Sequence, residues 1–320
     1  MPIDIKSYFE KNVIPLIALE CPEVISEISI QIPGSAGLGI DDEFSDLDAV
    51  IYLDDPLWET YGGRLQLVLE HSPQQFAPCK YHADVCVWPL SWLGKRREFL
   101  EDKLDLPWEE VTLEEFFEIQ ENLVLRDPHC IFRRLRESTA PDRYPDWLWK
   151  KRLLLEIKKL IFDDLRELEM AVIRDQILEA NIILGPVLED LLHIGFIINR
   201  RYYPWRKHLK WAFEKLPAIA SDVLSDMDKI ISSSSSDWHE KVESIKAIIN
   251  YYKEYIAENN LLPEIDILTT DTDYEFTWAE RCEAWSDPNW RDWVVRCKQK
   301  AKEAGYNESN FWIWSLWRHV

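Results

Sequence analysis

The chain has 320 residues, of which 58 are acidic and 37 are Lys or Arg, so its formal net charge at pH 7 is −21. This length allows two domains and a core that needs no disulfide or structural metal to fold. The acidic surplus argues against a protein whose main task is to grip nucleic acid, since that needs surplus Lys and Arg on the contact face. It does not exclude a local basic patch.

In the N-terminal third, helix and strand patterns alternate on short connections. The predicted elements, in chain order, are a helix over 4–20, a strand over Ile28–Ile32, a strand over Leu47–Leu53, a helix over about 56–70 and a strand over Tyr81–Trp88. The first strand is indicated by the period-two alternation of its isoleucines with Ser29 and Gln31, and the first helix by an apolar stripe. Three of the nine glycines lie in the loop between the first two strands.

After residue 100 the patterns become helical. Thr112 with Glu115 predicts a capping box at the start of a helix, and Ser138–Asp146, with two prolines, is the best linker candidate. Further helices are predicted over 154–172 and at about 176–200, 205–229 and 238–259. Four such amphipathic helices would bury their stripes in an antiparallel bundle. A Trp-rich tail follows from Asp271; its indoles either pack on the bundle or stack on a base or sugar.

These patterns predict an α+β protein of two domains. Residues 1–140 form a mixed sheet flanked by helices, and residues 141–320 form a helical bundle with the Trp-rich tail. The six cysteines include no Cys-x-x-Cys pair, which favours reduced thiols over a zinc site. No signal peptide is visible, and no stretch approaches the ~20 apolar residues of a membrane span. We therefore expect a cytoplasmic protein that does not bind membranes.

The segment that carries chemistry is the glycine loop and the strand that follows it. The loop reads Gly34-Ser35-Ala36-Gly37-Leu38-Gly39, and the strand opens with Asp46-Leu47-Asp48. Side chains alternate along a strand, so two aspartates two residues apart project to one side and repel each other unless a cation lies between them. Mg²⁺ suits carboxylate oxygens and substrate phosphates, and glycine-loop amides suit anionic oxygens. The pattern predicts a magnesium–nucleotide site.

These residues resemble the signature of the nucleotidyltransferase superfamily, which includes DNA polymerase β and the aminoglycoside nucleotidyltransferases. Gly34, Ser35, Gly39, Asp46 and Asp48 occupy the family's places: Gly-Ser, a further Gly, and Asp-x-Asp at the start of a strand. The resemblance implies that the glycine loop and its serine bind the nucleotide.

The superfamily also has a third carboxylate on a later strand, and Asp84 is the natural match. The resemblance then implies two Mg²⁺ ions held by Asp46, Asp48 and Asp84, with Asp84 also able to accept the acceptor's proton. Among other acidic residues, Glu179, Glu189 and Asp190 lie on predicted helices. One of them is an alternative base, although solvation at the surface is the default reading for each.

The segment from Asn199 to Lys207 resembles the helical-domain motif of a less characterised branch of the superfamily. By this resemblance Tyr203 and Lys207 bind the nucleotide, with Lys207 near the triphosphate. Five basic residues gather here in an otherwise acidic chain: Arg200, Arg201, Arg206, Lys207 and Lys210. Cations near a helix end also complement its dipole, so phosphate contact and helix stabilisation both remain open.

The resemblance implies transfer of a nucleoside monophosphate from a magnesium-bound nucleoside triphosphate to a hydroxyl group, with release of pyrophosphate. The acidic charge favours a cationic small-molecule acceptor such as an aminoglycoside. Transfer to tRNA or protein, as in toxin-type relatives, is an alternative, and the charge counts against nucleic acid without excluding it. A non-catalytic nucleotide-binding or interaction module is the other alternative. The sequence leaves the nucleotide base and the oligomeric state open.

Overall fold

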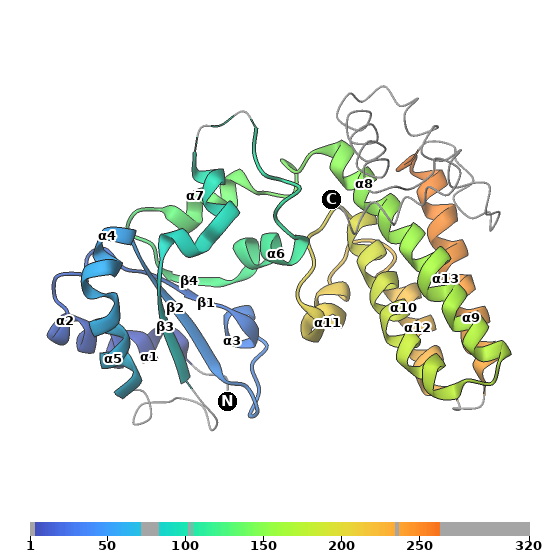
Figure 1. Cartoon of the computed structure of the whole chain (residues 1–320), viewed down its shortest axis with the longest axis horizontal. Helices are drawn as coiled ribbons and strands as arrows, with labels where there is room; N and C mark the ends of the chain where they lie inside the picture. Colours follow the sequence, from blue (N-terminus) through green and yellow to red (C-terminus); the bar gives the residue numbers. More distant parts are fainter. Residues whose placement is uncertain (1–3, 72–82, 102, 104, 234–236, 263–320) are drawn as a thin grey trace, which may run out of the picture. The chain divides into compact units, whose positions relative to one another are not determined.

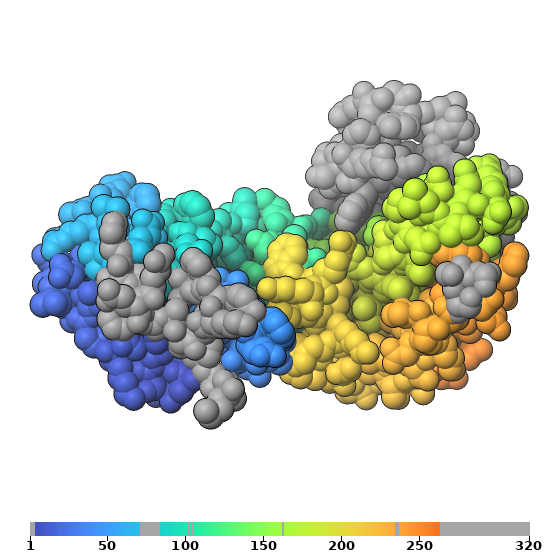
Figure 2. Space-filling model, turned by 90° about the horizontal axis from the view of Figure 1, so that it is seen from below, coloured from blue at the N-terminus to red at the C-terminus, as the bar shows by residue number. Residues whose placement is uncertain are grey.

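The computed structural model describes residues 4–71, 83–101, 103, 105–233 and 237–262. The chain divides into two compact units, 1–143 and 144–320 (Figure 1). Figure 2 shows the surface of the chain, from blue at the start of the first unit to orange at the end of the described part of the second. The Trp-rich segment from Asp271 onward lies outside the described residues.

The first unit contains a four-stranded mixed sheet flanked by helices, as expected. Its strands are β1 (Ser29–Ile32), β2 (Leu47–Leu53), β3 (Ala83–Pro89) and β4 (Leu123–Arg126). The strand order is β3-β2-β1-β4; β2 and β3 are parallel, and β1 runs antiparallel to β2 and β4. The parallel pair requires a crossover, which is provided by α4 (Asp55–Leu57), η2 (Trp58–Gly62) and α5 (Gly63–His71).

One face of this sheet carries the core of the first unit. Every second residue of these strands packs in a single buried cluster, which includes Ile30 and Ile32 on β1, Leu53 on β2 and Val87 on β3. The cluster includes side chains of α1 (Ile5–Tyr8), η1 (Phe9–Val13), α2 (Ile14–Glu20) and α5. Because side chains alternate along a strand, the residues between them project from the opposite face. That face carries Asp48 and Asp84.

The remaining elements of the first unit are α3 (Gly34–Leu38), η4 (Leu90–Leu100), α6 (Leu113–Glu121) and α7 (Ile131–Ser138). The predicted capping box is confirmed: the Glu115 amide donates to Thr112 Oγ1 at 3.2 Å, and the Thr112 amide donates to Glu115 Oε2 at 3.0 Å. Helix α7 ends at Ser138 and the next helix begins at Asp146, so the segment predicted as a linker connects two helices.

Strand β4 was not predicted. Its four residues directly follow α6 and read as an extension of the apolar pattern of that helix. Pairing with β1, in which Leu123 lies opposite Ile32 and Val124 opposite Gln31, makes the segment a strand. This is a tertiary contact that overrides a local pattern.

The described part of the second unit is helical. Its elements are α8 (Asp146–Lys158), η5 (Lys159–Leu165), α9 (Arg166–Ile173), α10 (Ile177–Ile198), η6 (Arg206–His208), α11 (Leu209–Phe213), α12 (Ala220–Ser232) and α13 (Trp238–Glu258). The helical path through α8, η5 and α9 is continuous, since the residues at both junctions keep helical backbone angles. The helix predicted over 205–229 is wrong as one element. It breaks between Phe213 and Ala220, where Pro217 cannot continue a helix and Ile219 has φ +66°.

Within the described residues, α10 is the one helix long and apolar enough to cross a membrane, with a mean hydropathy of 1.6 over its best window. This corrects the expectation that no such stretch exists. The helix packs against α8, α9, α11 and α13, and residues from Leu191 to Ile198 are largely buried there. The core helices of soluble proteins have the same composition, because a helix that is apolar all round is buried inside a protein or a bilayer.

Candidate functional site

Two of the predicted carboxylates are cross-strand neighbours. Asp48 is the second residue of β2 and Asp84 the second residue of β3, and the parallel register places them directly opposite each other. Adjacent strands lie about 4.8 Å apart, so both carboxylates project from the non-core face within reach of a common cation. Asp48 is partly buried and Asp84 is exposed. The site therefore opens to solvent.

The third carboxylate, Asp46, precedes the first residue of β2 and is exposed. The turn before it is held by Asp42, whose Oδ1 accepts from the Phe44 amide at 2.9 Å and from Ser45 Oγ at 2.9 Å. These hydrogen bonds lower the pKa of Asp42, so this acidic residue has a structural role in the turn. Asp46, Asp48 and Asp84 are not among the described groups of three whose donor atoms all lie within 4.8 Å of one another.

The glycine loop folds into the short helix α3 beside these carboxylates. A Cβ at Gly34, where φ is +70°, would lie 3.8 Å from Oδ2 of Asp48. The chain therefore leaves β1 directly alongside the carboxylate of β2. Gly39 ends the helix with φ +70°, and its amide donates to Ala36 O at 3.3 Å. Ser35 lies in the first turn, between Gly34 and the buried Ala36.

Farther along the same face, the surface changes from acidic to aromatic. Partial burial and the neighbouring carboxylate of Asp84 raise the pKa of Cys86, whose Sγ lies 3.8 Å from Asp84 Oδ1, and Asp48 raises it further. Beyond it, Tyr52 packs edge-on against Trp88 and Phe132, at centroid distances of 6.1 and 5.2 Å. Helix α7, which carries Phe132, covers this end of the face. The acidic end remains accessible.

The predicted nucleotide-binding residues of the second unit have different environments. Tyr203 is buried and its ring stacks on His193, with centroids 4.0 Å apart. Lys207 is exposed, in η6. Asn199 ends α10, and its side chain exchanges hydrogen bonds with the backbone of Ala218, so its role there is structural.

Three of the five clustered basic residues pair with carboxylates of the second unit. Arg206 binds Glu189 through two nitrogens, with Nη2 2.5 Å from Oε2. Arg200 contacts Asp146, and Lys210 Nζ lies 3.5 Å from Asp228 Oδ1. These three side chains therefore form ion pairs, a role that is neither the phosphate contact nor the helix-dipole contact left open by the sequence. The ion pairs do not involve Arg201 or Lys207.

A second group of ionisable residues was missed by the sequence interpretation. Glu156, Asp190 and His193 place their donor atoms within 4.8 Å of one another. Asp190 is fully buried, which corrects the expectation of a solvated surface carboxylate. Burial, with the neighbouring carboxyl groups of Asp164 and Glu156, raises its pKa to about 9 against the opposing effect of Lys159. The sequence could have indicated this cluster, because Asp190 and His193 are three residues apart on a predicted helix and therefore share a face.

Burial also lowers the pKa of His193 to about 4. The imidazole is therefore neutral at pH 7, and one ring nitrogen keeps a lone pair that can bind a cation. The stacked ring of Tyr203 fixes the plane of this imidazole.

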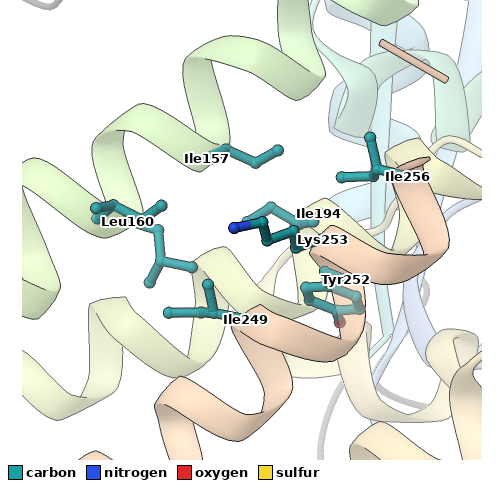
Figure 3. Close-up of a pocket in the computed structure, with 8 residues that line it drawn as sticks. Ile157, Leu160, Ile194, Ile249, Tyr252, Lys253 and Ile256 are labelled. Carbon is teal, nitrogen blue, oxygen red and sulfur yellow. The ribbon is translucent and has the colours of Figure 1, made fainter. Parts of the chain in front are cut away.

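A small apolar hollow lies near this group, on the side chains of α8, η5, α10 and α13. Figure 3 shows Ile157, Ile194 and Ile256 around it, with the amino group of Lys253 pointing into it. The hydroxyl of Tyr252, another lining residue, donates to Leu191 O at 2.7 Å. With an aliphatic lining and one cation, the hollow offers no convergent polar groups for chemistry.

Comparison with known protein families gives a match in the middle of the chain. Residues 108–212 match the family described as "Domain of unknown function (DUF4037)". The matched segment includes Glu156, Asp190, His193, Tyr203 and Lys207 and leaves out the three aspartates of the first unit. No curated protein matches the chain.

Proposed function

We propose that this protein is a metal-dependent nucleotidyltransferase of the DNA polymerase β-like superfamily, with a nucleotidyltransferase domain followed by a helical bundle. The observation that carries the proposal is the register of β2 and β3, which pairs Asp48 with Asp84 on the open face of the sheet. The order of strand, glycine turn, short helix and strand supports it. So does the close approach of Gly34 to Asp48. We also place the protein in the cytoplasm.

The donor set fits magnesium in its chemistry. Asp48 and Asp84 supply hard carboxylate oxygens from neighbouring strands, and Asp46 lies two residues before Asp48. Two bound Mg²⁺ ions would neutralise the triphosphate and stabilise the entering and leaving oxygens of an in-line displacement.

The chain's own residues would bind and orient the reactants. Gly34 and Ser35 would hold the phosphates through backbone amides and a hydroxyl, because the absent Cβ at Gly34 lets an anion approach the main chain. Asp84, the more exposed of the paired carboxylates, would accept the proton of the acceptor hydroxyl. Tyr203 and Lys207 are proposed as further nucleotide contacts, by resemblance alone.

The proposed acceptor is a cationic small molecule of the aminoglycoside type. The acidic turn before β2 and the paired aspartates concentrate negative charge on this side of the sheet. Such a field raises the local concentration of a cation and repels a phosphate backbone. A nucleoside triphosphate would then enter with its own Mg²⁺.

The test is nucleotide transfer by the purified chain. Wild type is incubated with Mg²⁺ and each of the four labelled nucleoside triphosphates, against a library of aminoglycosides and other polyols, tRNA and protein. We expect pyrophosphate release that depends on a cationic small-molecule acceptor and stops on chelation of the metal. Asp48→Asn should slow transfer on the order of 100-fold or more, because it removes a charged ligand needed in the transition state.

The matched control is Asp105→Asn, which removes an exposed carboxylate of the same unit and should transfer like the wild type. Equal pyrophosphate release by wild type and Asp48→Asn would refute catalysis and leave a binding module. Label found on tRNA or protein but never on a small molecule would refute the acceptor class and keep the reaction.

A further inference from the structure

Three potential metal ligands meet between two helices of the second unit. Glu156 lies on α8, and Asp190 and His193 lie on α10, which packs against α8. All three donor atoms lie within 4.8 Å of one another. Asp190 and His193 are three residues apart and therefore share one face of their helix. A carboxylate and a histidine at this spacing, opposite a carboxylate on a neighbouring helix, is a common way to build metal centres between helices.

Asp190 provides independent evidence for a ligand. Its side chain is fully buried, and its Oδ2 has no hydrogen-bond partner. Oδ2 of the adjacent Asp164 is also buried without a hydrogen bond. The raised pKa of Asp190 lets these two buried carboxyl oxygens share a proton, and a divalent ion would satisfy the same oxygens by replacing that proton.

The cation now beside these carboxylates is the ammonium group of Lys159. Its Nζ lies 2.5 Å from Asp190 Oδ1 and 3.7 Å from Asp164 Oδ2. The Lys159 side chain is 44% exposed, whereas Asp190 is 0% exposed. A lysine that reaches a buried carboxylate from the surface can swing back into water without opening the core. A metal ion is therefore able to replace it.

We propose that Glu156, Asp190 and His193 bind a divalent transition-metal ion of the Mn²⁺ or Zn²⁺ class. A set of two carboxylates and one imidazole suits these ions, whereas Mg²⁺ favours oxygen ligands alone. Binding joins α8 to α10 and displaces Lys159 from Asp190. All the ligands belong to the second unit, so this site is distinct from the aspartates on β2 and β3 and does not depend on the proposed transferase activity.

The experiment uses the full chain with Asp48→Asn and Asp84→Asn, so that the carboxylates of the first unit do not bind the titrant. After chelator treatment, this parent protein is titrated by calorimetry with MnCl₂ and with ZnCl₂, and Co²⁺ is added to record its visible absorption spectrum. We expect one equivalent of bound ion, a raised melting temperature and a Co²⁺ spectrum that reports nitrogen ligation. Asp190→Asn and His193→Ala should each weaken binding at least tenfold.

The control is Glu179→Gln, which removes an exposed carboxylate from the same helix and should bind like the parent. Lys159→Met gives the sharper test. If the ammonium competes with the ion for Asp190, its removal tightens metal binding; if the cluster is only an ion pair, the variant binds no ion. Circular dichroism identifies any variant that fails to fold, and the gain in affinity of Lys159→Met needs no loss of structure.

The proposal is overturned if the parent binds no ion, if His193→Ala and Asp190→Asn both titrate like the parent, or if Lys159→Met does not bind more tightly than the parent.

Discussion

At the scale of single residues, Gly37 has the tightest surroundings in the glycine loop. A Cβ there would lie 1.9 Å from the carbonyl oxygen of Ile32 and 2.8 Å from its carbonyl carbon. Both atoms belong to the end of β1, which cannot shift without disturbing the sheet. The glycine therefore lets α3 pack directly on the strand end, and this contact holds the loop beside Asp48.

We expect Gly37→Ala to lower the free energy of unfolding by about 3 kcal/mol or more, because the clash is with backbone. Gly39→Ala is the matched comparison: its φ of +70° strains an alanine, but nothing lies within 4 Å of the added Cβ. It should cost about 1–2 kcal/mol. Urea unfolding of the three proteins measures both values, and equal losses would contradict the packing argument.

The aspartates show which features of the candidate site can be predicted from the sequence. The Asp-x-Asp motif indicated Asp46 and Asp48 without any structure, because a strand's alternation is readable from the sequence. The pairing of Asp84 with Asp48 depends on strand register, which no local pattern encodes. Asp190 was misjudged for a related reason: an acidic residue on a helix looks solvated until the packing of a second helix against it is known.

At the scale of elements, the end of α12 is closed by a side chain from the next helix. Lys241 on α13 is buried, and its Nζ donates to the carbonyl oxygens of Ile230 at 2.6 Å and Ser233 at 3.3 Å. The last carbonyls of a helix lack partners within it. The lysine supplies both a donor and a positive charge at the negative end of the helix dipole.

Lys241→Met should therefore lower the free energy of unfolding by about 1–3 kcal/mol, since it removes the charged donor to both carbonyls and leaves Ile230 O with the Ser233 hydroxyl at 2.9 Å. Lys229→Met on α12 is the control, because that side chain is 68% exposed and pairs with Asp226 at the surface of the same helix. It should change stability by less than about 1 kcal/mol. Thermal or urea unfolding tests the pair, and similar losses in both variants would show that the buried position is unimportant.

Elements with a clear local sequence pattern were predicted correctly, whereas elements that form because of a tertiary contact were not. The three alternating strands and the Thr112 capping box follow from local rules. Strand β4 exists because β1 pairs with it. The helix predicted over 205–229 spans Pro217, the residue at which α11 and α12 are separated.

At the scale of the whole molecule, each of the two units buries apolar side chains of its own. Ile51, fully buried on β2, belongs to the sheet cluster, and Ile245, fully buried on α13, belongs to the second unit. Truncating either residue leaves a cavity, at a cost of about 2–5 kcal/mol. The cost should fall on the unit that contains the cavity.

Hydrogen–deuterium exchange of the full chain is expected to show this division. Ile51→Ala should lose amide protection within residues 4–143 and keep it in α8–α13, and Ile245→Ala should show the reverse. Loss of protection across both units in either variant would mean that they unfold as one cooperative body.

The parallel pairing of β2 with β3 also has a consequence for the order of folding. The antiparallel neighbours β1 and β2 are close in sequence, whereas β2 and β3 are separated by the whole crossover, and contacts of greater sequence separation form more slowly. The two carboxylates thus become neighbours in a slow step, and their mutual repulsion opposes the pairing of β3 with β2. Divalent ions in the refolding buffer would relieve that repulsion and accelerate the closing step, whereas a chelator would slow it.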